Sequence, residues 1–291
     1  MTHFQRALVL GGKTGLVGQA LMEALHGNGW EAKATERSTI DYTSSYAGEQ
    51  LEALVEEYAP TCIFNAVGYT AVDAAEEHPE EADLLNRALP AMVGRVAKQF
   101  SCQLVHYSTD FVFNGRKKTP YSVDDPTDPL NVYGKSKLAG EEALLALDFP
   151  DCIIIRTAWL FGPGKDNFIT KILRACKANS SINVVHDQIG SPTYTPDLAL
   201  YSLKLVEARA RGVFHVVNSG VASWCELASE ASRLAQAECT IMPIPSSAYP
   251  TKAVRPAYSV LDTSSLERAI GGSPRPWIQA LTDYVFREFP V

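Results

Sequence analysis

The first part of the chain alternates short apolar runs with longer segments of helical periodicity. Four runs, at residues 7–10, 61–66, 103–108 and 152–157, stay largely apolar on both faces. Strands with this pattern are typical of a parallel sheet that is covered on both sides. We therefore predict that these runs are strands, joined by helices in βαβ units.

The longer segments between these runs predict the helices. One helix covers residues 16–25, directly after the first strand, and another begins near Tyr133 and ends near residue 146. A third, over about 80–100, carries an apolar stripe for packing against the sheet, formed by Leu84, Leu85, Ala88, Met92 and Val96. Strands and helices in this order predict a doubly wound α/β fold with a parallel sheet.

Beyond residue 160 the pattern loosens into loops rich in glycine and proline, at 162–164, 190–192 and 243–256. Within this part, Ser223 and Glu226 form a capping-box pattern that marks the start of a helix. We predict a Rossmann domain over residues 1–160, completed by part of 193–220, and a smaller C-terminal α/β region over 161–291 that mainly binds substrate.

Composition narrows the class of protein. The chain is 46% hydrophobic and 20% charged, as expected for a compact globular protein, and its net charge of −7 argues against a nucleic-acid partner. Its six cysteines are scattered without a C-x-x-C pair, which fits a reducing compartment. With no apolar run long enough for a membrane span or a signal peptide, we expect a cytoplasmic protein without a membrane partner.

A glycine motif follows the first strand. Gly12, Gly15 and Gly18 form G-x-x-G-x-x-G between that strand and the next helix, a placement that favours dinucleotide binding over a turn without a ligand. We expect Gly12 to permit the tight turn, Gly15 to let backbone amides approach a pyrophosphate, and Gly18 to allow close packing of the helix.

The residues after the second strand bear on the choice of cofactor. A carboxylate such as Glu36 binds a ribose 2′-hydroxyl, whereas a guanidinium such as Arg37 binds a 2′-phosphate. The two neighbours therefore point to opposite cofactors.

Tyr133 and Lys137 lie four residues apart and share one face of the predicted helix. An ammonium beside a phenol lowers the phenol pKa, which suits a proton donor to a forming alkoxide. Thr109 lies at the carboxyl end of a predicted central strand, where ligands of open α/β sheets bind, and its hydroxyl could hold a substrate carbonyl. The alternative is that Thr109 and its neighbours only cap a turn.

Together, these elements resemble the extended short-chain dehydrogenase/reductases and, within them, the dTDP-4-dehydrorhamnose reductase family. The resemblance rests on Tyr-x-x-x-Lys with an upstream threonine, on segments 12–15, 65–66, 69–73, 106–110 and 131–141, and on later motifs at 156–159, 167–168, 187–188, 190–193 and 255–256. It implies reduction of the C4 ketone of dTDP-4-dehydro-6-deoxy-L-mannose to dTDP-L-rhamnose. In this reaction Tyr133 would donate the proton, Lys137 would also bind the nicotinamide ribose, and Thr109 would orient the carbonyl.

The motif and the resemblance together predict a full set of site residues. Cofactor-binding residues are Gly12, Thr14, Gly15, Leu16, Val17, Gly18, Glu36, Arg37, Asp41, Tyr42, Ala66, Gly68, Tyr69, Thr70, Tyr133 and Lys137. Substrate-binding residues are Thr109, Asp110, Trp159 and Arg255, although Trp159 also fits a half-buried packing role and Arg255 a solvated one. We expect NADP(H), slightly preferred over NAD(H), as the cofactor.

The resemblance has limits. Enteric members bind magnesium through glutamates at a dimer interface, but this chain has Ala20 and about Pro196 at the corresponding positions. We therefore expect no metal, and a monomer or homodimer. The alternatives are another nucleotide-sugar 4-ketoreductase or epimerase, and a non-catalytic NADP-binding regulatory subunit like that of methionine adenosyltransferase. The intact set of Thr109, Tyr133 and Lys137 favours an enzyme over a binding subunit.

Overall fold

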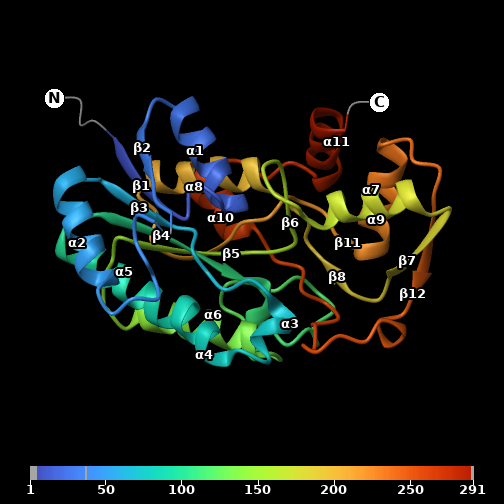
Figure 1. Ribbon diagram of the computed structural model, residues 1–291, viewed down its shortest axis with the longest axis horizontal. Helices are drawn as coiled ribbons and strands as arrows, with labels where there is room; N and C mark the ends of the chain where they lie inside the picture. The colour runs from blue at the N-terminus through green and yellow to red at the C-terminus, as the bar shows by residue number, and fades with distance from the viewer. Residues whose placement is uncertain (1–4, 37, 290–291) are drawn as a thin grey trace.

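A six-stranded parallel sheet forms the centre of the computed structural model, which describes residues 5–36 and 38–289 (Figure 1). Its order is β10-β5-β4-β3-β1-β2, with β1 (Arg6–Leu10), β2 (Glu31–Ala34), β3 (Cys62–Asn65), β4 (Gln103–Thr109), β5 (Cys152–Thr157) and β10 (Gly212–His215). The four predicted strands are confirmed. Because β1 has β2 on one side and β3 on the other, the strand order reverses there, and ligands of such sheets bind at the carboxyl ends beside that point.

Helices cover both faces of the sheet (Figure 1). On one face lie α1 (Leu16–Gly27), α8 (Thr195–Glu207) and α10 (Ser264–Ile270), and on the other lie α2 (Ala47–Tyr58), α5 (Leu89–Gln99) and α6 (Val132–Leu145). Each face has its own apolar core. Two short helices, α3 (Val72–Ala75) and α4 (Pro79–Asp83), and the 3-10 turn η2 (Asp110–Val112) complete this part. The predicted doubly wound Rossmann architecture is confirmed.

The helix predicted over 80–100 is not continuous. Between α4 and α5 lies a π-helical turn, η1 (Leu84–Ala88), which contains one residue more per turn than an α-helix. The wider turn shifts the buried face, so Leu84, Leu85, Ala88 and Met92 are only partly buried, whereas Asn86 is fully buried. Val96 belongs to the core on this face, and Leu85 and Met92 pack against it while partly buried, as predicted, whereas Leu84 and Ala88 do not, and the polar side chain of Asn86 takes an interior position.

The C-terminal region packs three helices around its own core, on the right of Figure 1. The helices are α7 (Phe168–Ala178), α9 (Trp224–Leu234) and α11 (Trp277–Glu288). Three small sheets pair β6 (Leu160–Phe161) with β9 (Thr193–Tyr194), β7 (Ser181–Val185) with β12 (Thr240–Ile244), and β8 (Ile189–Gly190) with β11 (Ala222–Ser223), and a short 3-10 turn η3 (Ser246–Ala248) follows β12. The predicted capping box of Ser223 and Glu226 is confirmed at the start of α9.

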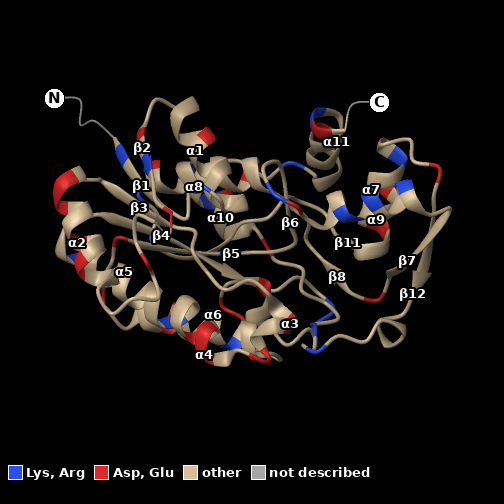
Figure 2. Cartoon of the chain, in the orientation of Figure 1, with Lys and Arg blue, Asp and Glu red and all other residues tan. Residues whose placement is uncertain are grey.

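Two later segments return to the large sheet. Helix α8 and strand β10 both come from residues 193–220, and β10 pairs in parallel with β5. Figure 2 shows acidic residues along α2 and α4, on the outside of the sheet layer. None of the helices within the described residues combines the length and the apolar character needed to cross a membrane.

Candidate active site

A cavity of about 420 Å³ opens where the carboxyl ends of β4 and β5 meet the C-terminal region. Residues from the glycine-rich loop, the segment after β3, α6 and the loop after β5 all line it. It brings together ten of the predicted site residues: Val17, Ala66, Gly68, Thr70, Thr109, Asp110, Tyr133, Lys137, Trp159 and Arg255. The predicted Gly12, Thr14, Gly15, Leu16, Gly18, Glu36, Asp41, Tyr42 and Tyr69 do not line it.

Thr109 and Asp110 form the floor of this cavity at the end of β4. The Thr109 hydroxyl oxygen accepts from the Phe111 amide at 3.2 Å and lies 3.1 Å from Oδ1 of Asp110. Burial raises the pKa of Asp110 to about 6, against hydrogen bonds from Ser259 and Thr109 that lower it. Within the described residues, Oδ2 of Asp110 has no hydrogen-bond partner. Asp110 lines the cavity, so its carboxyl group lies at the boundary of the space that a ligand would occupy.

Tyr133 lies in the first turn of α6, and the side chain of Asn131 caps this helix by accepting from the Gly134 amide at 2.7 Å. The phenol ring meets Phe111 edge to face, with ring centroids 5.8 Å apart. Burial raises the pKa of Tyr133 to about 12, although a hydrogen bond with Thr109 lowers it. The phenol therefore keeps its proton at neutral pH.

Lys137 follows one turn later on α6 and is almost completely buried. Its ammonium donates to the Tyr107 carbonyl and lies 3.5 Å from Nε2 of His106, whose other ring nitrogen is 3.2 Å from Nδ2 of Asn65. Burial lowers the pKa of Lys137 to about 8. The sequence predicts that Lys137 lowers the pKa of Tyr133, but the shift of Tyr133 runs the other way, because desolvation outweighs every other influence on the phenol. Sequence reasoning also missed the contact with His106.

Two buried polar networks hold these strand and helix ends in place. In the first, Arg156 on β5 donates to both carboxylate oxygens of Glu141 on α6, at 2.7 to 3.1 Å, and Ser108 donates to the same carboxylate. The Arg156 and Glu141 side chains are only 6% and 1% exposed. This ion pair fixes α6, which carries Tyr133 and Lys137, against the strands that end at the cavity.

The second network starts from Asn86 in the π-helical turn. Its amide accepts from the Tyr69 N–H at 2.9 Å and donates to the Tyr69 carbonyl at 3.0 Å and to the Ser136 hydroxyl at 2.9 Å. A Cβ on Gly140 would lie 2.0 Å from the Asn86 carbonyl oxygen, so α6 can approach this turn only at a glycine. Asn86 therefore joins the loop after β3 to α6.

The glycine-rich loop differs in detail from its prediction. The left-handed residue of the turn is Gly11, with φ +77°, rather than Gly12, which instead packs against Ala34. A Cβ on Gly18 would lie 2.3 Å from the Gly11 carbonyl oxygen, which explains the close approach of α1. Gly15 is the N-cap of α1 and makes no side-chain capping bond, so the helix N-terminus carries no side chain that would compete with an anion.

The segment after β2 contains four of the predicted cofactor-binding residues, at positions 36, 37, 41 and 42. Nζ of Lys13 lies 2.6 Å from Oε1 of Glu36, an ion pair that the sequence did not reveal. Asp41 accepts from the amide and hydroxyl of Thr43, and the Tyr42 phenol lies 2.6 Å from the Thr35 hydroxyl. Arg37 lies outside the described residues.

Trp159 and Arg255 occupy the side of the cavity towards the C-terminal region. The Trp159 indole stacks on Trp224, with ring centroids 3.5 Å apart and planes within 5° of parallel. The Arg255 guanidinium forms a two-bond ion pair with Asp73, at 3.1 and 2.8 Å, and so lies between the two parts of the chain. Neither Asp73 nor Trp224 is among the predicted site residues.

A second cavity of about 400 Å³ adjoins the first. Trp224 and Arg255 line both cavities, whereas Phe168, Lys171 and strand β7 line only the second. Phe168 and Lys171 are not among the predicted site residues, although residues 167–168 carry part of the family resemblance. Within residues 5–36 and 38–289, no group of three or more His, Cys, Asp or Glu side chains is arranged to hold a metal ion.

A parallel Rossmann sheet with threonine, tyrosine and lysine gathered at its carboxyl edge, facing a smaller C-terminal region, defines an extended short-chain dehydrogenase/reductase. The family described as "RmlD substrate binding domain" matches residues 6–288. The chain therefore belongs to the RmlD family and is an enzyme of the NAD(P)-dependent dTDP-sugar reductase class.

Individual relatives agree with this assignment. The chain is 37% identical to the dTDP-4-dehydrorhamnose reductase of Mycolicibacterium smegmatis, over 96% of this chain and 84% of the relative. It is also 37% identical to the dTDP-4-keto-6-deoxy-D-glucose reductase of Streptomyces niveus, over 93% of each chain. The crystal structure of the dTDP-4-dehydrorhamnose reductase of Bacillus anthracis in complex with NADP superimposes with a TM-score of 0.92 and 31% identity, covering 97% of this chain and 99% of the other.

Proposed function

We propose that this enzyme reduces the C4 ketone of dTDP-4-dehydro-6-deoxy-L-mannose (dTDP-4-dehydrorhamnose) and produces dTDP-L-rhamnose. The observation that carries the proposal is that Thr109, Tyr133 and Lys137 line one cavity at the carboxyl ends of β4 and β5. The dTDP-4-dehydrorhamnose reductases of Mycolicibacterium smegmatis and Bacillus anthracis support the choice of substrate.

The chain's own residues fit a nicotinamide dinucleotide. The uncapped start of α1 at Gly15 offers backbone N–H groups to a pyrophosphate, and a Cβ on Gly68 would lie 3.0 Å from Oδ1 of Asn86 and 3.8 Å from Nζ of Lys137. Because Gly68 has no side chain, its backbone can lie close to Lys137, and both line the cavity in which Lys137 would bind the nicotinamide ribose. When bound, the nicotinamide supplies the hydride for the ketone carbon.

The proton for the ketone oxygen would come from Tyr133. With a pKa of about 12 the phenol is fully protonated at neutral pH, so it is ready to donate when a ketone is reduced. Thr109 lines the same cavity and would hold the carbonyl oxygen beside this phenol. The Lys137 ammonium, still charged below about pH 8, would stabilise the phenolate that remains after transfer.

The substrate would occupy both cavities. Its sugar fits the cavity of Thr109 and Tyr133, and its nucleotide fits the neighbouring one, which Lys171 borders together with Arg255 and its ion-pair partner Asp73. On this basis we propose the division of labour expected from the sequence: residues 1–160, with part of 193–220, bind the cofactor, and the rest of 161–291 mainly binds the nucleotide sugar.

For the cofactor we propose NADPH, with a slight preference over NADH. Lys13 adds a cation beside Glu36 at the end of β2, where the ribose 2′-position of a Rossmann ligand lies. An ammonium there favours a 2′-phosphate, whereas Glu36 alone would disfavour it. The bound NADP of the Bacillus anthracis relative supports this preference.

A second candidate is reduction of another dTDP-4-keto sugar with the same chemistry. The Streptomyces niveus relative, a dTDP-4-keto-6-deoxy-D-glucose reductase, is as similar in identity as the Mycolicibacterium smegmatis relative. Thr109, Tyr133 and Lys137 would act identically on either sugar, so the rest of the cavity must discriminate between them.

The deciding experiment supplies dTDP-4-dehydrorhamnose, generated in the assay by the preceding enzymes, with NADPH or NADH. Cofactor oxidation is followed by absorbance and the sugar product is identified by chromatography. We expect dTDP-L-rhamnose, formed faster with NADPH at subsaturating cofactor. Cofactor binding without turnover of this ketone, and turnover of dTDP-4-keto-6-deoxy-D-glucose instead, would replace the proposal with the second candidate.

A further inference from the structure

Trp224 lies on the boundary between the two cavities of the site. It is the first residue of α9, where the reciprocal capping bonds of Ser223 and Glu226 fix the helix start. One face of its indole lies against Trp159, and its ring also contacts Phe168, with centroids 4.6 Å apart. We call the cavity of Thr109 and Tyr133 the sugar cavity and the neighbouring one the nucleotide cavity. Trp159 lines only the sugar cavity and Phe168 lines only the nucleotide cavity, whereas Trp224 lines both.

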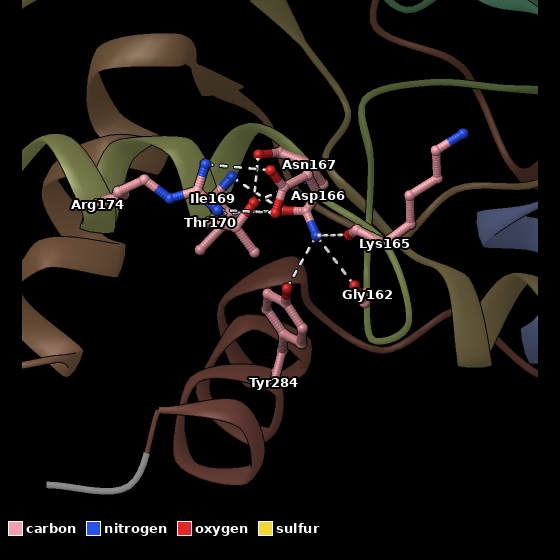
Figure 3. Close-up of polar contacts among 8 residues, drawn as sticks. All are labelled: Gly162, Lys165, Asp166, Asn167, Ile169, Thr170, Arg174 and Tyr284. Carbon is pink, nitrogen blue, oxygen red and sulfur yellow. Dashed lines mark hydrogen bonds and ion pairs between the residues drawn. The ribbon is translucent and has the colours of Figure 1, made fainter.

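Phe168 is held as firmly as Trp224. It is the first residue of α7, which Asn167 caps by accepting from the amides of Ile169 and Thr170 (Figure 3). The Asn167 amide also donates to the Gly162 carbonyl at 2.9 Å and to the Tyr284 phenol at 2.8 Å, which ties the loop before α7 to α11. In the aromatic row of Trp159, Trp224 and Phe168, the last two residues are therefore each the first residue of a capped helix.

The position of Trp159 depends on this row. Its backbone has φ +48°, a left-handed conformation that a bulky residue rarely adopts without support from its surroundings. A Cβ on Gly190 would lie 2.5 Å from Cε2 of Trp159 and 2.7 Å from the two neighbouring ring atoms, Cζ2 and Nε1, so only a glycine fits against this face of the indole. With Trp224 stacked at 3.5 Å on one face and Gly190 against the other, a ligand can reach only the edge of this indole that the two leave uncovered.

We infer that Trp224 is a positioning residue that determines sugar specificity: it holds Trp159 against the sugar and separates the sugar cavity from the nucleotide cavity. The inference rests on the proposed function for the identity of the ligand. A pyranose ring packed against the uncovered edge of Trp159 would be selected by the orientation of its substituents, because the stacked pair cannot move aside without losing its own contact.

The test compares Trp224→Ala and Trp224→Phe with the wild type by equilibrium binding of dTDP, dTDP-L-rhamnose and NADPH. We expect Trp224→Ala to weaken dTDP-L-rhamnose binding by about tenfold, while dTDP and NADPH binding change by less than about threefold. Trp224→Phe, which keeps an aromatic face, should restore most of the loss. In turnover, the KM for the nucleotide sugar should rise with little change in kcat.

A spectroscopic signature reports the stack without activity. Two parallel indoles in contact give an exciton couplet in circular dichroism, which Trp224→Phe and Trp159→Phe should both abolish and the distant control Trp30→Phe should preserve. Loss of the couplet in Trp224→Ala with an unchanged preference for dTDP-L-rhamnose over dTDP would overturn the inference, as would an equal loss of affinity for both ligands in that variant. If the wild type itself shows no such preference, the proposed substrate fails, and that result is visible without any variant.

Discussion

The carboxyl edge of the six-stranded sheet and the C-terminal region contribute different kinds of side chain to the same site. On the sheet side the side chains are polar or charged and buried: Lys137, Glu141, Arg156 and Asn86. Hydrogen bonds and one ion pair join the helices and strands that carry them. On the other side, the row of Trp159, Trp224 and Phe168 is aromatic and only partly buried. A buried charge tolerates little change in its partner, whereas stacked rings can be replaced by similar rings.

This contrast separates chemistry from selection. The same proton transfer is required for any 4-keto sugar, so the polar edge can stay rigid while the aromatic side adapts to a particular sugar. Substitutions on the sheet side should therefore affect folding and turnover, and substitutions on the aromatic side should mainly affect which ligand binds.

The largest expected effect is on the buried ion pair. Glu141→Leu leaves the Arg156 guanidinium unpaired in the interior, and we expect it to lower the free energy of unfolding by about 3–5 kcal/mol. The double variant Glu141→Leu/Arg156→Met should recover much of that loss, because no charge then remains buried alone. Urea denaturation measures both. As a control, Asp166→Asn in the exposed pair with Arg174 should change stability far less, and equal losses in the two pairs would contradict the comparison.

The next effect is on turnover. Tyr133→Phe removes the proton donor but keeps the ring that packs on Phe111, so kcat should fall by about a hundredfold or more while the dissociation constant for NADPH stays close to that of the wild type. Steady-state kinetics and fluorescence titration separate the two quantities. Tyr58→Phe, which removes a phenol without a partner in the described part of the chain, is the matched control and should leave turnover unchanged. Wild-type turnover by Tyr133→Phe would remove this residue from the chemistry.

The parts of the molecule that could be predicted from the sequence are those that depend on near neighbours. Runs apolar on both faces identify the central strands, and the four-residue spacing of Tyr133 and Lys137 places both on α6. The π-helical turn could not be predicted, because the burial of Asn86 depends on its fit against Gly140 of another helix. For the same reason the partnership of Trp159 with Trp224 has no local signal: a residue far along the chain supplies the second ring.

A smaller effect concerns pH and again tests the polar edge. Burial lowers the pKa of Lys137 from 10.5 to about 8, so NADPH affinity and turnover should fall as the pH rises through about 8 and the ammonium loses its charge. Stability should move the opposite way. Between about pH 8 and 10.5 the unfolded chain still binds this proton and the folded chain does not, so the contribution of Lys137 to the free energy of unfolding rises with pH. A pH–rate profile and denaturation at each pH test the two directions together; a parallel loss of activity and stability would point to unfolding instead.

The smallest effect is expected from the capping bond that fixes Trp224. Ser223→Ala removes the hydroxyl that accepts from the Glu226 amide at 3.1 Å, and loss of such a cap costs about 1 kcal/mol. The control is Ser229→Ala on the same helix, which removes only the hydrogen bond from the Ser229 hydroxyl to the Cys225 carbonyl. It should lower the free energy of unfolding by less, because alanine is the better helix former. If the aromatic side selects the sugar, Ser223→Ala should also raise the KM for the nucleotide sugar slightly at constant kcat. A fall in kcat at constant KM would instead mean that the start of α9 acts on the chemical step. It would then be wrong to assign catalysis to the sheet edge and sugar selection to the C-terminal region alone.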